Sequence, residues 1–102
     1  VVFAGSVIQP ETTVGAHTII NTASSVDHDC IVGDFVHVGP GARVCGGVTV
    51  DEGVLLGVGA KVVPNVEIGP WAIVGAGAVC VVDVPGESTV VGVPARAIEG
   101  DG

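Results

Sequence analysis

An apolar residue recurs at every sixth position of this chain, from its second residue to residue 80. No insertion or deletion interrupts the series. A period of six matches neither the 3.6 residues of an α-helix nor the 3.5 of a coiled coil, so the pattern does not predict helices. The series consists of Val2, Ile8, Val14, Ile20, Val26, Val32, Val38, Val44, Val50, Leu56, Val62, Ile68, Val74 and Cys80.

The position four residues after each apolar residue is restricted in size. It is small or β-branched in every hexad. This residue and the next apolar one are separated by a single residue, so in a strand both side chains point to the same side. The small one leaves room for a larger aliphatic side chain from a neighbouring strand. This second series consists of Ser6, Thr12, Thr18, Ser24, Cys30, Val36, Ala42, Val48, Val54, Ala60, Val66, Ala72, Ala78 and Val84.

The position directly after each apolar residue favours turns. Gly, Asn or Asp occupies most of these positions, and these residues tolerate tight corners or a positive φ. We therefore expect each short strand to be followed by a corner. The turn-favouring residues are Gly15, Asn21, Asp27, Gly33, Gly39, Asp51, Gly57, Gly69 and Gly75.

Strands and corners that alternate in hexads predict an all-β fold, a parallel β-helix. Three hexads close one triangular coil of eighteen residues, and the coils stack at about 4.8 Å. The series predicts four to five coils over residues 1–85, followed by a closing segment and tail over residues 86–102, since the cluster Pro85–Ser88 breaks the register. The first coil begins as an open β edge, from which we expect an N-terminal portion to precede it.

Composition narrows the possible partners and the cellular setting. The net charge of −8 repels phosphate backbones and anionic lipids, so nucleic acid is not an expected partner. No apolar stretch approaches the length of a membrane span. The three cysteines are odd in number and lack a CxxC spacing, which favours a reducing, cytoplasmic setting. Cys30 and Cys80 fall at inward positions and are expected in the core, whereas Cys45 falls at a corner.

Two segments resemble a known enzyme superfamily. The hexads closing with Val90-Val91-Gly92-Val93-Pro94-Ala95-Arg96 resemble the hexapeptide-repeat acyltransferases, which form left-handed parallel β-helices. The run from Ile20 to Cys30, followed by Gly33–Val38, resembles the sugar acetyltransferases related to sialic acid O-acetyltransferase and to nucleotide-amino-sugar N-acetyltransferases. The left hand of the coil is taken from this resemblance, because the usual rule for parallel crossovers would predict a right-handed coil.

The resemblance implies an activity and an assembly. Such proteins transfer acetyl from acetyl-CoA to an amino or hydroxyl group of a sugar, without a metal. They are usually homotrimers with each active site between two subunits. Many carry an N-terminal Rossmann-like domain for the sugar nucleotide, and this domain is absent from the present sequence. The expected partners are therefore a sugar or nucleotide-sugar substrate and two further copies of the chain.

The resemblance also implies the site residues. His28 corresponds to the catalytic base and Asp29 to the acidic residue that follows it. His37 corresponds to a second histidine that lines the acetyl-CoA site. Further cofactor contacts, largely through backbone atoms, fall at Gly46, Val58 and Ala76, the last replacing a glycine of some relatives.

The chemistry of the residues agrees with these roles. His28 lies two positions after Val26, at a corner, so its ring should point outward. A neutral imidazole with a pKa near the working pH suits a general base that takes a proton from a sugar amine or hydroxyl. A carboxylate at Asp29, or alternatively at Asp27, would stabilise the imidazolium. A backbone N–H near Gly46 could stabilise the thioester oxyanion.

Other interpretations remain open on the sequence alone. His28, Asp29 and His37 could be ordinary surface residues, and His17 is given no role beyond the surface. Phe35 and Trp71 lie at outward positions, where they would pack between subunits or contact adenine or pantetheine.

Two rival functions use the same fold. A γ-type carbonic anhydrase needs three zinc-binding histidines, but the three histidines here have spacings of eleven and nine residues, which do not fit. A non-catalytic structural β-helix would be expected to carry a face of repeated Thr-x-Thr or an unbroken apolar ladder, and the sequence contains neither.

Overall fold

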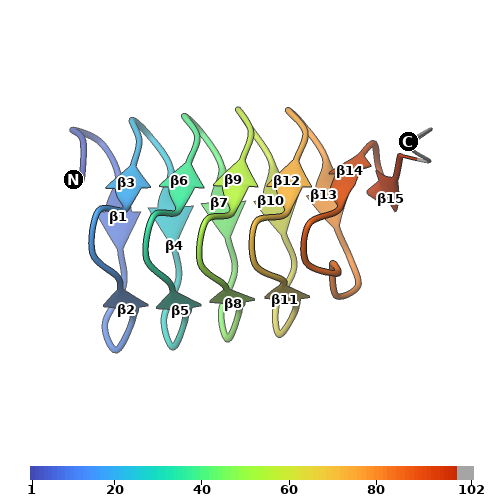
Figure 1. Ribbon diagram of the computed structural model, residues 1–102. Helices are drawn as coiled ribbons and strands as arrows, with labels where there is room; N and C mark the ends of the chain where they lie inside the picture. Colours follow the sequence, from blue (N-terminus) through green and yellow to red (C-terminus); the bar gives the residue numbers. More distant parts are fainter. Residues whose placement is uncertain (99–102) are drawn as a thin grey trace.

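The chain folds as a stack of triangular coils. The computed structural model describes residues 1–98, which contain fifteen short strands and no helix (Figure 1). The strands are β1 (Val7–Ile8), β2 (Thr13–Val14), β3 (Ile19–Ile20), β4 (Ser25–Val26), β5 (Ile31–Val32), β6 (His37–Val38), β7 (Arg43–Val44), β8 (Thr49–Val50), β9 (Leu55–Leu56), β10 (Lys61–Val62), β11 (Glu67–Ile68), β12 (Ile73–Val74), β13 (Val79–Cys80), β14 (Thr89–Val91) and β15 (Arg96–Ala97).

Three sheets form the sides of the prism. Face I contains β1-β4-β7-β10-β13, face II contains β2-β5-β8-β11, and face III contains β3-β6-β9-β12-β14-β15. Each strand pairs in parallel with the strand one coil away, as Val7 pairs with Ser25, and only β15 turns back antiparallel against β14. The predicted parallel β-helix of four to five coils is confirmed, and the arrangement is consistent with the left hand that the resemblance implies. Of the predicted closing segment and tail, residues 99–102 lie outside the described residues.

The corners between the sheets form three edges that run along the prism. Each corner has four residues, which we number from first to fourth, except the last I–II corner, which is shortened because Val84 pairs with Ile68 of face II. The I–II edge consists of residues 9–12, 27–30, 45–48, 63–66 and 81–82; the II–III edge of 15–18, 33–36, 51–54, 69–72 and 85–88; and the III–I edge of 3–6, 21–24, 39–42, 57–60 and 75–78. Residues 92–95 connect β14 to β15 within face III.

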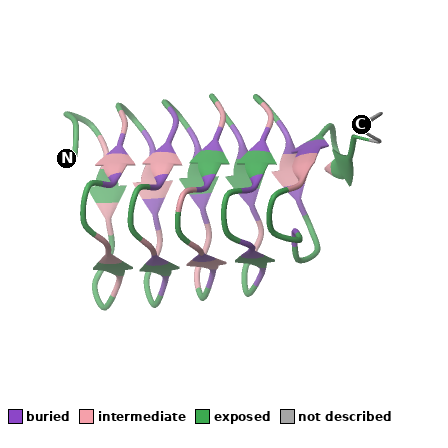
Figure 2. Ribbon diagram, viewed as in Figure 1, coloured by how far each residue is buried: buried purple, intermediate pink, exposed green. Residues whose placement is uncertain are grey.

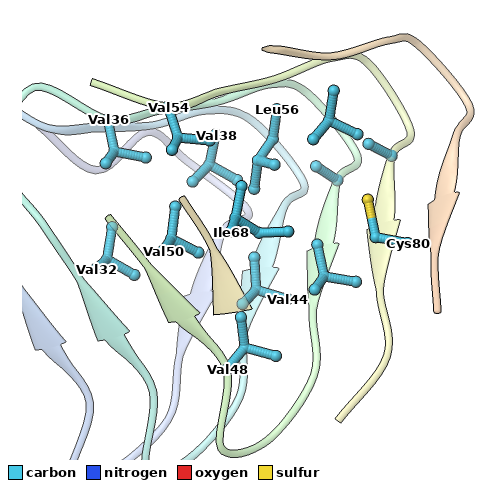
Figure 3. Packing of buried hydrophobic residues seen from close by; sticks show 14 of the residues in the cluster. Val32, Val36, Val38, Val44, Val48, Val50, Val54, Leu56, Ile68 and Cys80 are labelled. Atoms are coloured by element: carbon cyan, nitrogen blue, oxygen red, sulfur yellow. The ribbon is translucent and has the colours of Figure 1, made fainter. Parts of the chain in front are cut away.

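The core lies along the axis of the prism, and both predicted inward series line it (Figures 2 and 3). From Ile20 to Cys80 every member of the aliphatic series is at most 1% exposed. Val2 is 53% exposed because no coil covers the first one. Cys30 and Cys80 are core residues as predicted, and burial raises the pKa of both thiols.

The corners differ from the expectation in one respect. Positive φ angles lie at the third corner residue, not at the first; Phe35 and Trp71 adopt this conformation with φ of 58° and 61°. Glycine is favoured at the first corner residue for a different reason, close contact with the next coil. A Cβ at Gly39 would lie 2.6 Å from the carbonyl oxygen of Leu56, and one at Gly57 would lie 2.7 Å from the backbone nitrogen of Ala76.

The second corner residue has a backbone N–H that the sheets do not use. Within residues 1–98, no second-position N–H donates a backbone hydrogen bond, whereas from Phe35 to Glu87 the third-position N–H donates to the coil before it, as Gly59 does to Pro40 at 2.9 Å. Proline lacks an N–H and is therefore tolerated at the second position. It occurs there at Pro10, Pro40, Pro64 and Pro70.

Inward and outward isoleucines of face II should differ in their effect on stability. Ile68 is fully buried, so Ile68→Ala should lower the free energy of unfolding by about 2–5 kcal/mol. Ile31 is 55% exposed, and Ile31→Ala should change the free energy of unfolding by less than about 1 kcal/mol. Urea denaturation of both variants checks this. Equal losses would mean that the outward series is also buried in solution.

Candidate functional site

His28 and Asp29 form a polar pair on the I–II edge, in the corner between β4 and β5. His28 Nδ1 lies 3.1 Å from Asp29 Oδ2, and the two side chains are 69% and 59% exposed. When Nδ1 carries the proton and donates it to the carboxylate, Nε2 is left free to accept a proton. The backbone of His28 is held by the N–H of Gly47, which donates to its carbonyl at 3.2 Å. The histidine therefore projects outward from a fixed corner.

An open groove of about 530 Å³ surrounds this pair. It crosses three successive corners of the I–II edge. A Cβ at Gly46 would lie 3.4 Å from His28 Cε1, so glycine there leaves the imidazole ring free of crowding. The groove is lined by Asp27, His28, Asp29, Cys45, Gly46, Gly47, Pro64 and Asn65.

Sequence reasoning assigned no role to Asn65, which lines the groove. It occupies the third corner position, as Asp29 does, two coils further along the same edge. Its side chain lies over Gly47, where the missing side chain leaves room for it. The eighteen-residue coil repeat is the signal that could have placed Asn65 beside the pair.

His37 lies on a different side of the prism. It begins β6 on face III, is half-buried, and its Nε2 is 3.3 Å from Asn21 Nδ2. Because the amide group donates, Nε2 acts as the acceptor, and the Oδ1 of Asn21 accepts the N–H of Thr22 at 2.7 Å. Asn21 is a second polar partner that sequence reasoning left without a role. As expected, one chain does not bring His28 and His37 together.

The remaining predicted cofactor residues divide between two edges. Val58 and Ala76 lie on successive corners of the III–I edge, where Gly77 N–H donates to the Val58 carbonyl at 2.8 Å. Gly46 lies with His28 on the I–II edge. The predicted site thus has two parts, on the two edges that border face I.

Gly46, Val58 and Ala76 share one geometric property. All three are second corner residues, so each has a backbone N–H that no described backbone carbonyl accepts. Elsewhere such N–H groups bind side-chain oxygens: Ala16 donates to Asp34 Oδ1 at 2.8 Å. These positions therefore offer donors to a ligand without disturbing the sheets.

The II–III edge carries none of the predicted site residues. Phe35 stacks on His17 there, with ring centroids 5.2 Å apart and planes 12° apart, and Trp71 lies across Gly53. Both Phe35 and Trp71 are more than half exposed. Their position separates them from the groove around His28 and from Val58 and Ala76.

Neither a cluster of metal-ligating side chains nor a membrane-spanning helix occurs in the described part of the chain. Residues 1–98 contain no group of three or more His, Cys, Asp or Glu side chains arranged to hold a metal ion. His17, His28 and His37 lie on the II–III edge, the I–II edge and face III. The same residues include no helix with the length and apolarity of a membrane span.

Solved acetyltransferases are similar to this chain over nearly its whole length, although its sequence matches no family model. The acetyltransferase domain of PglB from Neisseria gonorrhoeae, in complex with acetyl coenzyme A, is 39% identical with a TM-score of 0.94, over 95% of this chain and 47% of that one. A perosamine N-acetyltransferase mutant from Caulobacter crescentus, in complex with CoA and GDP-perosamine, is 37% identical with a TM-score of 0.90, over 97% and 56%.

A third similar structure is WeeI from Acinetobacter baumannii, 30% identical with a TM-score of 0.75 over 93% of this chain and 56% of that one. The chain spans about half the length of each of these three proteins. The resemblance drawn from the sequence is confirmed: the structural neighbours of this chain are hexapeptide-repeat acetyltransferases, nucleotide-amino-sugar N-acetyltransferases among them.

Proposed function

We propose that this chain is the β-helix of an acetyl-CoA-dependent sugar acetyltransferase, which acetylates an amino or hydroxyl group of a nucleotide-amino-sugar or a sialic acid. The observation that carries the proposal is the His28–Asp29 pair, exposed in a groove and held at 3.1 Å. The similar PglB domain was solved with acetyl coenzyme A, and the perosamine enzyme with CoA and GDP-perosamine.

In the proposed reaction His28 acts as general base. Its Nε2 takes a proton from the acceptor nitrogen or oxygen as that atom attacks the thioester carbonyl. The new C–N or C–O bond forms, the C–S bond breaks, and the departing thiolate takes the proton back from the imidazolium. The Asp29 carboxylate stabilises the imidazolium in between. The unused N–H of Gly46 lies in the same groove and is the candidate donor to the oxyanion.

Acetyl-CoA would lie along the III–I edge, with His37, Val58 and Ala76 as its contacts. The unused N–H groups of Val58 and Ala76 belong to exposed corner residues one coil apart. They can donate to amide and carbonyl oxygens of the pantetheine arm. No metal takes part in this proposal.

The two parts of the site lead us to propose a homotrimer. In a ring of copies, the I–II edge of one chain can face the III–I edge of the next, and such a head-to-tail contact closes into a symmetric ring. Face III also carries outward apolar residues: Leu55 and Ile73 are 40% and 43% exposed.

Because acetyl-CoA is a metabolite of the cell interior, we propose a cytoplasmic location.

Substitution at the pair tests the mechanism. His28→Asn should lower kcat by about 10²–10⁴ with little change in the KM for acetyl-CoA, because the general base is lost. Asp29→Asn should give a smaller loss, and asparagine tolerates the φ of 60° at this position. Thiol release with nucleotide-amino-sugars and sialic acids as acceptors measures both. His17→Asn is the control, and single-turnover acetyl transfer at the full rate by His28→Asn would refute the mechanism.

Mixed assemblies test the intersubunit site. His28→Asn removes the base on one edge, and Ala76→Glu blocks the cofactor on the other, so each homogeneous protein should be nearly inactive. Random mixing by co-refolding should restore about a quarter of the wild-type activity, since each site then draws its two halves independently from two chains. Light scattering should give about three times the 10.0 kDa mass of the chain. A site within one chain predicts no recovery.

A further inference from the structure

The fold sorts the acidic residues onto one side of the prism. Every carboxylate side chain in residues 1–98 lies on face II or on one of the two edges that border it. Face I, face III and the III–I edge carry none within the same residues. The I–II edge has Glu11, Asp27 and Asp29, face II has Glu67 and Asp83, and the II–III edge has Asp34, Asp51, Glu52 and Glu87.

The crowding of negative charge on this side is strong enough to affect ionisation. Asp51 is the largest cause of a raised pKa at Glu67, through its charge and a side-chain hydrogen bond, and Asp83 adds to it. The Oδ1 of Asp83 also accepts the backbone N–H of Glu67 at 2.9 Å. An anionic ligand would be repelled from face II.

The basic residues lie on the other side. Arg43 and Lys61 are the outward residues of β7 and β10 on face I, are paired in register on adjacent strands, and are exposed. Like charges directly opposite each other in a sheet are destabilising. Among the described residues, His28–Asp29 is the one ion pair within 4.0 Å. Neither Arg43 nor Lys61 therefore has a carboxylate of this part of the chain at that distance.

Arg43 and Lys61 lie on the face that borders both edges used in the proposed site. Face I borders the I–II edge, which carries His28, and the III–I edge, which carries Val58 and Ala76. Strand β7 directly precedes the corner that contains Gly46, and strand β10 directly follows the corner that contains Val58. In the proposed trimer the two edges of one chain belong to two neighbouring sites, so the cations on face I border a ligand at either site.

We propose that Arg43 and Lys61 form the phosphate-binding site for a phosphate-bearing substrate of the proposed acetyl transfer, and this inference rests on that proposed function. Both candidate substrates carry the required group: CoA has a pyrophosphate and a 3′-phosphate, and a nucleotide sugar has a pyrophosphate. A guanidinium binds phosphate oxygens in a bidentate manner, and an ammonium adds a compact charge. An anionic ligand would also relieve the repulsion between the two cations.

Direct binding measurements test the site independently of catalysis. Calorimetric titration of the wild-type chain with CoA, dephospho-CoA and GDP is compared with Arg43→Gln, Lys61→Gln and the double variant. The double variant should lose affinity for a phosphate ligand by about 10- to 100-fold, the effect of removing charge-assisted hydrogen bonds. Arg96→Gln is the matched control, since Arg96 is exposed and the change in net charge per substitution is the same. It should change affinity by less than about twofold.

The ligands distinguish the two sources of phosphate. If the site binds the 3′-phosphate of CoA, the wild-type preference for CoA over dephospho-CoA should disappear in the double variant. If it binds a pyrophosphate, the affinity for dephospho-CoA or for GDP should fall. Either result supports the site.

Other outcomes would overturn it. Equal losses in Arg96→Gln would indicate a general effect of net charge. Unchanged affinities together with a smaller mass in light scattering would mean that the two cations contact carboxylates of another copy. If the double variant transfers acetyl with unchanged KM values, this site is refuted and the proposed function stands. If the wild-type chain binds CoA through the pair but acetylates no sugar, the proposed function fails and this site stands.

Discussion

The ladder of backbone hydrogen bonds between coils, which brings residues eighteen positions apart into register, is the interaction on which the rest of this structure depends. Each hexad contributes only two strand residues, which could not form a stable sheet on their own. When the coils stack in parallel, each strand pairs with its counterparts in the neighbouring coils. Each hexad then buries one aliphatic and one small side chain along the axis. Because the repeat contains no insertion, the same ladder fixes the outward residues, so every position of the hexad becomes a straight row along the prism.

Much of the fold was predictable because burial is periodic. The inward series from Ile20 to Cys80 follows from the six-residue spacing alone. The backbone conformation of the corners was not predictable in the same way. Glycine at the first corner position suggested a positive φ there, but it is favoured by the close approach of the next coil, as at Gly39 and Gly57. Sequence composition cannot separate these two causes, since both select the residue without a Cβ.

The candidate site was predictable in part. The outward position of His28 follows from its place in the hexad, and the contact with Asp29 is local in sequence. The contact of His37 with Asn21 and the place of Asn65 in the groove depend on contacts between coils, so the spacing of eighteen, and not any local motif, determines them. The division of the site between two edges depends on which corner each hexad occupies. This is a property of the three-sided coil and not of any single segment.

The sorting of charge follows from the same geometry and changes how the composition is understood. A net charge of −8 suggests a protein that repels phosphates from its whole surface. In the described chain, however, the carboxylates occupy rows along face II and its edges, and the rows on face I and the III–I edge are basic or neutral. A ligand within a few ångströms of the surface responds to the charges of its own row, because salt screens interactions beyond about 8–10 Å. On this surface the row that a residue occupies therefore matters more to an anionic ligand than the total charge.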